Sequence, residues 1–218
     1  MSKADDFLVE IGTEELPPKA LRALMEAFGA NLEAGIDDAR LAHGEVRSYA
    51  SPRRLAVAVD NLARSQDDRR VEQKGPPVRV AFDADGNPTP AATAFATKCG
   101  TTVEKLDRIE TEKGEWLVFH TIEKGKAAAE LLPDIIERSL GSLPIPRRMR
   151  WGAGEAEFVR PVHWVVLLHG GKTIQASIMG ITAGNKTRGH RFHTTKPITV
   201  SSPGDYLRTL EEKGHVIA

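Results

Sequence analysis

The residues with the clearest chemical bias are the basic side chains in the second half of the chain. The stretch from Arg138 to Lys196 carries ten Lys or Arg residues, and its only acids are Glu155 and Glu157, although the formal net charge of the chain is zero. Such a segment attracts a polyanion, whereas residues 1–137, in which acids outnumber bases, repel one. Nucleic acid is therefore the first partner to consider.

Aromatic residues alternate with these bases. Arginine guanidinium groups hold phosphates through paired hydrogen bonds and aromatic rings stack on unpaired bases, which is how proteins bind single-stranded or folded RNA. The structural alternative is that Arg160 and Arg191 neutralise buried carboxylates while Trp151 anchors a loop on the core. We predict RNA contacts at seven residues: Arg147, Arg148, Arg150, Trp151, Arg188, His190 and Arg191.

Other kinds of site find little support. The segment 180–187 resembles a phosphate-binding P-loop, but Arg188 and the residues after it lack the helical apolar spacing that such a loop requires. No Gly-x-Ser-x-Gly motif is present, and the histidines do not have the spacing of metal ligands. Adjacent acids such as Glu14 and Glu15 point in different directions, and His163 is interpreted as a strand residue. The sequence predicts no catalytic residue and no metal site.

Composition indicates a globular chain. With 218 residues, 40% hydrophobic and 28% charged, it can bury one large core or two modest ones. The longest apolar run, residues 162–168, is far shorter than the ~20 residues of a membrane helix. The acidic N-terminus does not resemble a signal peptide, and the single cysteine, Cys99, suits a reducing compartment. We expect a cytoplasmic protein without a membrane partner.

Hydrophobic spacing predicts the elements of the first part. A strand over 7–11 is followed by a helix whose apolar residues run from Leu21 to Ile36, and Glu14 and Glu15 stand before that helix, where carboxylates favour its dipole. A strand over 55–59 forms a hairpin with 46–49. The charged segment 61–76 ends in Gly-Pro-Pro, which marks a boundary between two lobes, 1–72 and 78–218, if the chain is not a single domain over 1–218.

The remaining segments predict further helices and hairpins. We expect a strand over 78–82, a helix over 91–98, and a helix around residues 131–140. Hairpins are predicted for 107–112 with 115–123, turning at Lys113-Gly114, and for 162–168 with 173–179, turning at Gly170-Gly171. Ser202 and Pro203 open a last helix that ends at Gly214. The predicted fold class is α+β, with mixed, mostly antiparallel sheets and packed helices.

Seven strings in this order resemble the beta subunit of the bacterial heterotetrameric glycyl-tRNA synthetase. Together they extend from one end of the chain to the other, which makes the resemblance specific. They are Leu8–Leu21 (LVEIGTEELPPKAL), Pro52–Leu55 (PRRL), Lys74–Pro76 (KGP), Lys113–Trp116 (KGEW), Met149–Gly152 (MRWG), Phe158–His163 (FVRPVH) and Arg188–Phe192 (RGHRF).

The resemblance implies most of what we expect of function. Family members are several times longer, so the chain would be an N-terminal fragment. They work as two alpha and two beta subunits, in which the alpha subunit carries the class II site for glycine, ATP and magnesium while the beta subunit recognises glycine tRNA. This part of the family resembles the editing-type domain of the phenylalanyl-tRNA synthetase beta subunit. Because glycine is the smallest amino acid, a second sieve has little to do.

Three hypotheses remain open at this point. The first is a non-catalytic domain that contacts tRNA, but not DNA, within a glycine–tRNA ligase. The second is a structural module that contacts the alpha subunit or other beta-subunit domains. The third, which the resemblance to an editing-type domain permits, is a hydrolase for misacylated tRNA. The fragment itself is expected to need no cofactor.

Overall fold

The chain forms two compact units. The computed structural model describes residues 3–112, 114–152 and 154–218. The first unit comprises the chain up to Asp67 and from Lys126 onward, and the second comprises Asp68–Gly125, so the second is inserted into the first. This division differs from the lobes 1–72 and 78–218, because Gly75, Pro76 and Pro77 belong to a strand and the chain returns to the first unit after residue 125.

A five-stranded sheet organises the first unit. Its central strand β1 lies between β3 and β9 and is antiparallel to both. The predicted hairpin of 46–49 with 55–59 is confirmed by the pairing of β2 with β3. In spatial order the strands are β10 (Lys172–Thr173), β9 (Val162–His169), β1 (Ala4–Thr13), β3 (Arg54–Ala63) and β2 (Val46–Ser51).

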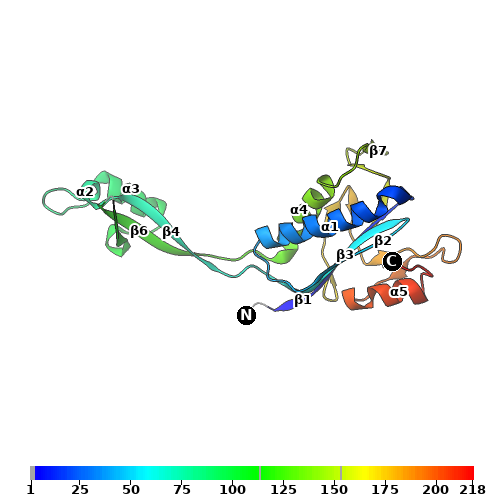
Figure 1. The fold of residues 1–218 in the computed structure, drawn as a ribbon. Helices are drawn as coiled ribbons and strands as arrows, with labels where there is room; N and C mark the ends of the chain where they lie inside the picture. Colours follow the sequence, from blue (N-terminus) through cyan, green and yellow to red (C-terminus); the bar gives the residue numbers. More distant parts are fainter. Residues whose placement is uncertain (1–2, 113, 153) are drawn as a thin grey trace. The chain divides into compact units, whose positions relative to one another are not determined.

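Helices cover both faces of this sheet (Figure 1). On one face α1 (Pro18–Asp38) and α4 (Ala128–Gly141) pack their apolar residues against Phe7, Val9 and Ile11 of β1. On the other face α5 (Tyr206–Glu212), which follows the 3-10 turn η2 (Pro203–Asp205), packs near Leu8. Because successive strand residues point to opposite faces, burial of both sets explains why β1 is apolar from Phe7 to Gly12 except for Glu10.

Short strand pairs complete the first unit: β7 (Met149–Arg150) with β8 (Glu157–Phe158), β11 (Ser177–Ile178) with β12 (Ile181–Thr182), and β13 (Lys186–Thr187) with β14 (Ile198–Thr199). The predicted turn at Gly170-Gly171 is present, but β10, which follows it, pairs with β9 only at Lys172 and Thr173, and one further backbone hydrogen bond runs from Ile174 N–H to the Leu167 carbonyl. Residues 177–178 pair with β12 instead, so the predicted arm 173–179 was too long.

The second unit is a three-stranded antiparallel sheet with two short helices. Strand β6 (Gly114–Glu123) lies between β4 (Arg69–Pro77) and β5 (Asp107–Thr111), which confirms the predicted 107–123 hairpin, although Lys113 of its turn lies outside the described residues. Helix α3 (Pro90–Lys98) confirms the prediction for 91–98, and η1 (Val103–Lys105) follows it.

The predicted strand over 78–82 was wrong. Residues Val78–Ala81 form the short helix α2, and Ala81 packs against Ala92 and Leu117 in the small core of the second unit. The backbone bends there because β4 already ends at Pro77, opposite Trp116 of β6. The α+β class with mostly antiparallel sheets is confirmed. None of the described helices is long and apolar enough to cross a membrane.

Candidate RNA-binding surface

A buried ion pair lies within the five-stranded sheet. Glu10 on β1 is completely buried, Arg54 at the start of β3 is 2% exposed, and Arg54 Nη1 lies 3.6 Å from Glu10 Oε2. Both side chains belong to the α5 side of the sheet, where Leu8 and Ala56 pack. Burial of two charges is costly unless they are paired and hydrogen-bonded, so their partners decide what the pair does.

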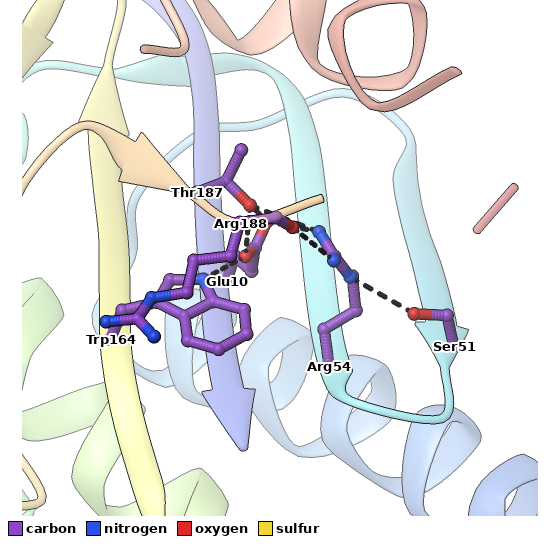
Figure 2. A network of polar contacts seen from close by, with 6 residues as sticks. All are labelled: Glu10, Ser51, Arg54, Trp164, Thr187 and Arg188. Carbon is purple, nitrogen blue, oxygen red and sulfur yellow. Dashed lines mark hydrogen bonds and ion pairs between the residues drawn. The ribbon is translucent and has the colours of Figure 1, made fainter. Parts of the chain in front are cut away.

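Thr187 and Trp164 supply those partners (Figure 2). The Thr187 hydroxyl donates to Glu10 Oε1 at 2.7 Å and accepts a hydrogen bond from Arg54 Nη1 at 3.1 Å, and the Trp164 indole N–H also donates to Glu10. Trp164 reaches the carboxylate by lying across Gly12, where any side chain would overlap the indole ring. Glycine at this position is therefore a requirement of the network.

The network also fixes the loop that begins at Arg188. Arg54 Nη2 donates to the backbone carbonyl of Arg188 at 2.6 Å, and Arg54 Nε donates to Ser51 Oγ at 3.1 Å. Next in the loop, His190 N–H donates to the carbonyl of Gly214 at 2.7 Å. A Cβ on Gly189 would lie 2.6 Å from that carbonyl oxygen, so only glycine lets the two backbones approach this closely.

Tyr206 closes the network from the first turn of α5. Its hydroxyl is buried near Glu10 and Arg54, but it makes no hydrogen bond of ordinary geometry with the described residues. Burial, reinforced by the nearby Glu10 carboxylate, raises the pKa of Tyr206 well above its ordinary value. The phenol is therefore neutral, and it serves as a packing group beside the ion pair.

A cleft of about 360 Å³ opens beside this loop. Its walls come from the β2–β3 turn, the 189–192 loop and the 215–217 segment, and include Arg53, His190, Arg191, Phe192 and Ile217. A wider hollow lined by Glu14, Glu15 and Arg160 shares Arg191 with the cleft. Of the sequence-predicted residues, the structure thus brings His190 and Arg191 to one cleft, and Arg188 lies directly before them.

Two carboxylates stand at the same end of the sheet. Backbone bonds from Glu14 N–H to the Pro161 carbonyl and from Leu16 N–H to the Pro52 carbonyl hold this segment in place. Glu14 Oε1 lies 2.8 Å from His163 Nε2 and 3.8 Å from Arg53 Nη2, and Glu15 Oε1 lies 3.2 Å from Arg191 Nη1. These exposed pairs are weak, since surface ion pairs contribute about 0–1 kcal/mol.

The local charge is positive. Among the described residues that line the cleft and the hollow or cover Trp164, and apart from the Glu10–Arg54 pair, the acidic and the Lys or Arg side chains are two carboxylates and four arginines, namely Glu14, Glu15, Arg53, Arg160, Arg188 and Arg191. Guanidinium carbons of Arg53 and Arg188 lie 5.9 and 5.6 Å from the Trp164 ring centroid, and Arg191 lies 4.8 Å from that of Phe192. A guanidinium group that stacks on an aromatic ring still has N–H donors in its plane, which suits phosphate binding where those donors reach solvent. Arg53 Nε does not reach solvent.

The other predicted string lies elsewhere in the first unit. Arg147 and Arg150 are exposed, but Trp151 packs against the cluster shared with α1 and α4, and β7 lies on their side of the sheet in Figure 1. Arg148 Nη2 donates to the carbonyl of Gly141 at 2.6 Å, at the end of α4. Because Arg188 instead covers Trp164 on the α5 side, the structure does not bring the two strings to one face.

Sequence reasoning missed several residues of this arrangement. Glu10 is a charge within an apolar strand, and such a residue signals a buried partner, which proved to be Arg54. Glu14 and Glu15 were assigned to the dipole of α1 and His163 to the strand alone, yet Glu14 contacts His163. Their pairing depends on contacts across the sheet that local spacing does not encode. Among the described residues, no group of three or more His, Cys, Asp or Glu could hold a metal ion.

The chain is therefore an α+β protein with a cleft bordered by arginines. Comparison with known proteins places it among the aminoacyl-tRNA synthetases. Residues 7–218 match the family model of the glycyl-tRNA synthetase beta subunit. The chain belongs to this family, as the sequence resemblance predicts.

Curated relatives agree. Glycine–tRNA ligase beta subunits from Marinobacter nauticus, Hahella chejuensis and Citrobacter koseri are 56%, 53% and 54% identical to the chain. The alignments cover 98%, 98% and 97% of it. The chain spans 31% of the length of each of these relatives, so most of their sequence has no counterpart here.

Proposed function

We propose that this chain is the non-catalytic N-terminal part of a glycine–tRNA ligase beta subunit and that it contacts glycine tRNA through the cleft beside residues 188–192. The observation that carries the proposal is the group of four arginines around two carboxylates at one end of the sheet. Positive groups of this kind bind the phosphate backbone without requiring a particular sequence.

The chemistry of the whole enzyme would lie outside this chain. In the proposed arrangement, two alpha and two beta subunits act together in the cytoplasm, and the alpha subunit binds ATP, magnesium and glycine at a class II site. The residues described here would then raise the affinity for tRNA and orient it, without contacting the reacting atoms.

The Arg147–Trp151 string supports a second function, assembly with the alpha subunit or with later domains of the beta subunit. Met149 is 41% exposed between Arg147 and Arg150, while Trp151 and Arg148 tie the string to the core. An exposed methionine flanked by arginines on a fixed hairpin is typical of a protein interface, where Met and Arg are enriched.

Measurements of tRNA binding and subunit assembly on variants of the assembled enzyme distinguish the two proposed functions. Arg191→Met should weaken binding of glycine tRNA and reduce the slope of log affinity against log salt by ~1, because one phosphate contact is lost. Arg147→Glu should instead weaken subunit assembly and leave that slope unchanged. Arg22→Met is the matched control, since Arg22 forms an exposed ion pair with Glu26 on α1. If Arg191→Met leaves tRNA affinity and salt dependence unchanged, the tRNA-contact proposal is refuted.

A further inference from the structure

We propose that the cleft beside the 188–192 loop holds one unpaired nucleotide of the RNA. Its phosphate would lie against Arg53 and Arg191 and its base against Phe192. This inference rests on the proposed tRNA contact and adds the chemical group that the cleft recognises.

The phosphate side of the cleft has donors to spare. The Arg53 side chain is 22% exposed, and its Nη2 lies 3.8 Å from Glu14 Oε1, too far for a hydrogen bond. Arg53 Nε is buried, so a phosphate would contact the terminal nitrogens of this guanidinium group. Arg191 has an exposed partner in Glu15, whose side chain is 60% exposed. Water screens that pair, so a phosphate, which accepts two hydrogen bonds from one guanidinium group, can displace the carboxylate.

The base side is aromatic and apolar. Phe192 is 76% exposed, and the guanidinium of Arg191 lies 4.8 Å from its ring centroid. Ile217 and Val216 line the same cleft. An exposed ring beside arginines is how proteins stack the bases of single-stranded nucleic acid, because every base has a face that an aromatic side chain can cover.

The size of the cleft favours a single nucleotide. Its volume of about 360 Å³ lies at the lower end of the ~300–1,000 Å³ that small-molecule sites occupy. Bases within a duplex are stacked on each other and cannot present a face to Phe192, so the nucleotide must be unpaired. The loop needs little ordering on binding, because Arg54 holds the Arg188 carbonyl and Gly189 packs on Gly214.

Titration of the chain with AMP, adenosine and inorganic phosphate tests the inference. AMP should bind at least tenfold more tightly than either adenosine or phosphate, since only AMP uses both sides of the cleft. Phe192→Ala should weaken AMP binding by roughly five- to tenfold and leave phosphate binding unchanged. Arg191→Met should weaken both, and Arg22→Met should weaken neither. Because Phe192 and Arg191 are exposed, the variants should keep the circular dichroism of the parent chain.

Three results would overturn the inference: AMP binding no tighter than phosphate, an unchanged AMP affinity in Phe192→Ala, or failure of glycine tRNA to displace AMP. The last result would assign the cleft to a free nucleotide instead of one belonging to tRNA. If glycine tRNA binds in an Arg191-dependent manner while AMP does not bind, the nucleotide site is wrong and the proposed tRNA contact stands. If neither ligand binds, both are wrong.

Discussion

Replacing Arg54 with methionine should destabilise the first unit by about 3–5 kcal/mol, because the substitution leaves the Glu10 carboxylate buried without its cation. The carboxylate keeps two donors, the Trp164 indole N–H and the Thr187 hydroxyl, but neither carries a charge. Methionine preserves most of the side-chain volume, so the loss reports the charge and its hydrogen bonds more than a cavity.

A double variant separates the charge from the hydrogen bonds. In Glu10→Gln/Arg54→Met both charges are gone, while the glutamine carbonyl oxygen still accepts from Trp164 or Thr187. Since replacing a whole buried ion pair is often nearly neutral whereas breaking one is costly, the double variant should be more stable than Arg54→Met alone by about 2 kcal/mol. The sign of this difference identifies an isolated buried charge as the cause.

Hydrogen exchange of the β1 and β3 amides is the appropriate assay. The chain has two units, so a single global transition would mix their stabilities, whereas these amides report the opening of the first unit. A loss below 1 kcal/mol in Arg54→Met, or a double variant no more stable than it, would refute the reasoning. Arg54→Met should also weaken tRNA binding, because Arg54 no longer holds the Arg188 carbonyl.

Three further substitutions give expected outcomes. Gly12→Ala should cost roughly 1–3 kcal/mol in hydrogen exchange of the β1 amides, because the new Cβ displaces the Trp164 indole; unchanged exchange would contradict that packing. Glu15→Gln should strengthen tRNA binding in a filter-binding assay, since Arg191 loses a competing carboxylate, and a weaker complex would mean that Glu15 orients Arg191 for RNA. Tyr206→Phe should stabilise the chain by about 1 kcal/mol, because it removes a buried hydroxyl that makes no hydrogen bond of ordinary geometry with the described residues. The folded-state pKa of Tyr206 lies above the ordinary value of 10.0, so the free energy of unfolding does not depend on this group below pH 10 and falls as the pH rises further, because the unfolded chain loses the proton first. Tyr206→Phe should remove that part of the alkaline loss of stability, and an equal loss in both proteins would contradict it.

Much of the fold follows from local patterns. The apolar residues from Leu24 to Ile36 lie on one side of a helix at helical spacing, and they do pack on the sheet as predicted. The predicted strand over 78–82 was wrong because Val78 and Ala81 pack against residues of α3 and β6, and those tertiary contacts override the β-propensity of valine. Pairing of β9 with β1 joins residues some 150 positions apart, and no local pattern specifies it.

The part of the candidate site that is local in the sequence could also be predicted. Arg188, His190 and Arg191 follow one another in the sequence and remain together in the structure, because Gly189 and Arg54 hold their backbone. Glu15, the carboxylate partner of Arg191, comes from the loop after β1, and Arg53 comes from the turn before β3. Sequence spacing identified the loop, whereas the cleft exists only once three distant segments meet.

The charge density of a sequence counts the cationic side chains in a segment. A polyanion, however, binds only those side chains whose hydrogen-bond donors remain free after folding. Arg148 illustrates the difference, since it donates to the Gly141 carbonyl near the C-terminus of α4, where a cation also interacts favourably with the helix dipole. The Arg54 guanidinium group likewise has internal partners in Glu10, Ser51 and the Arg188 carbonyl, so it is not available to RNA. An arginine-rich string therefore supports RNA binding to the extent that its guanidinium groups face solvent with weak partners, and Arg191 meets that condition where Arg148 does not.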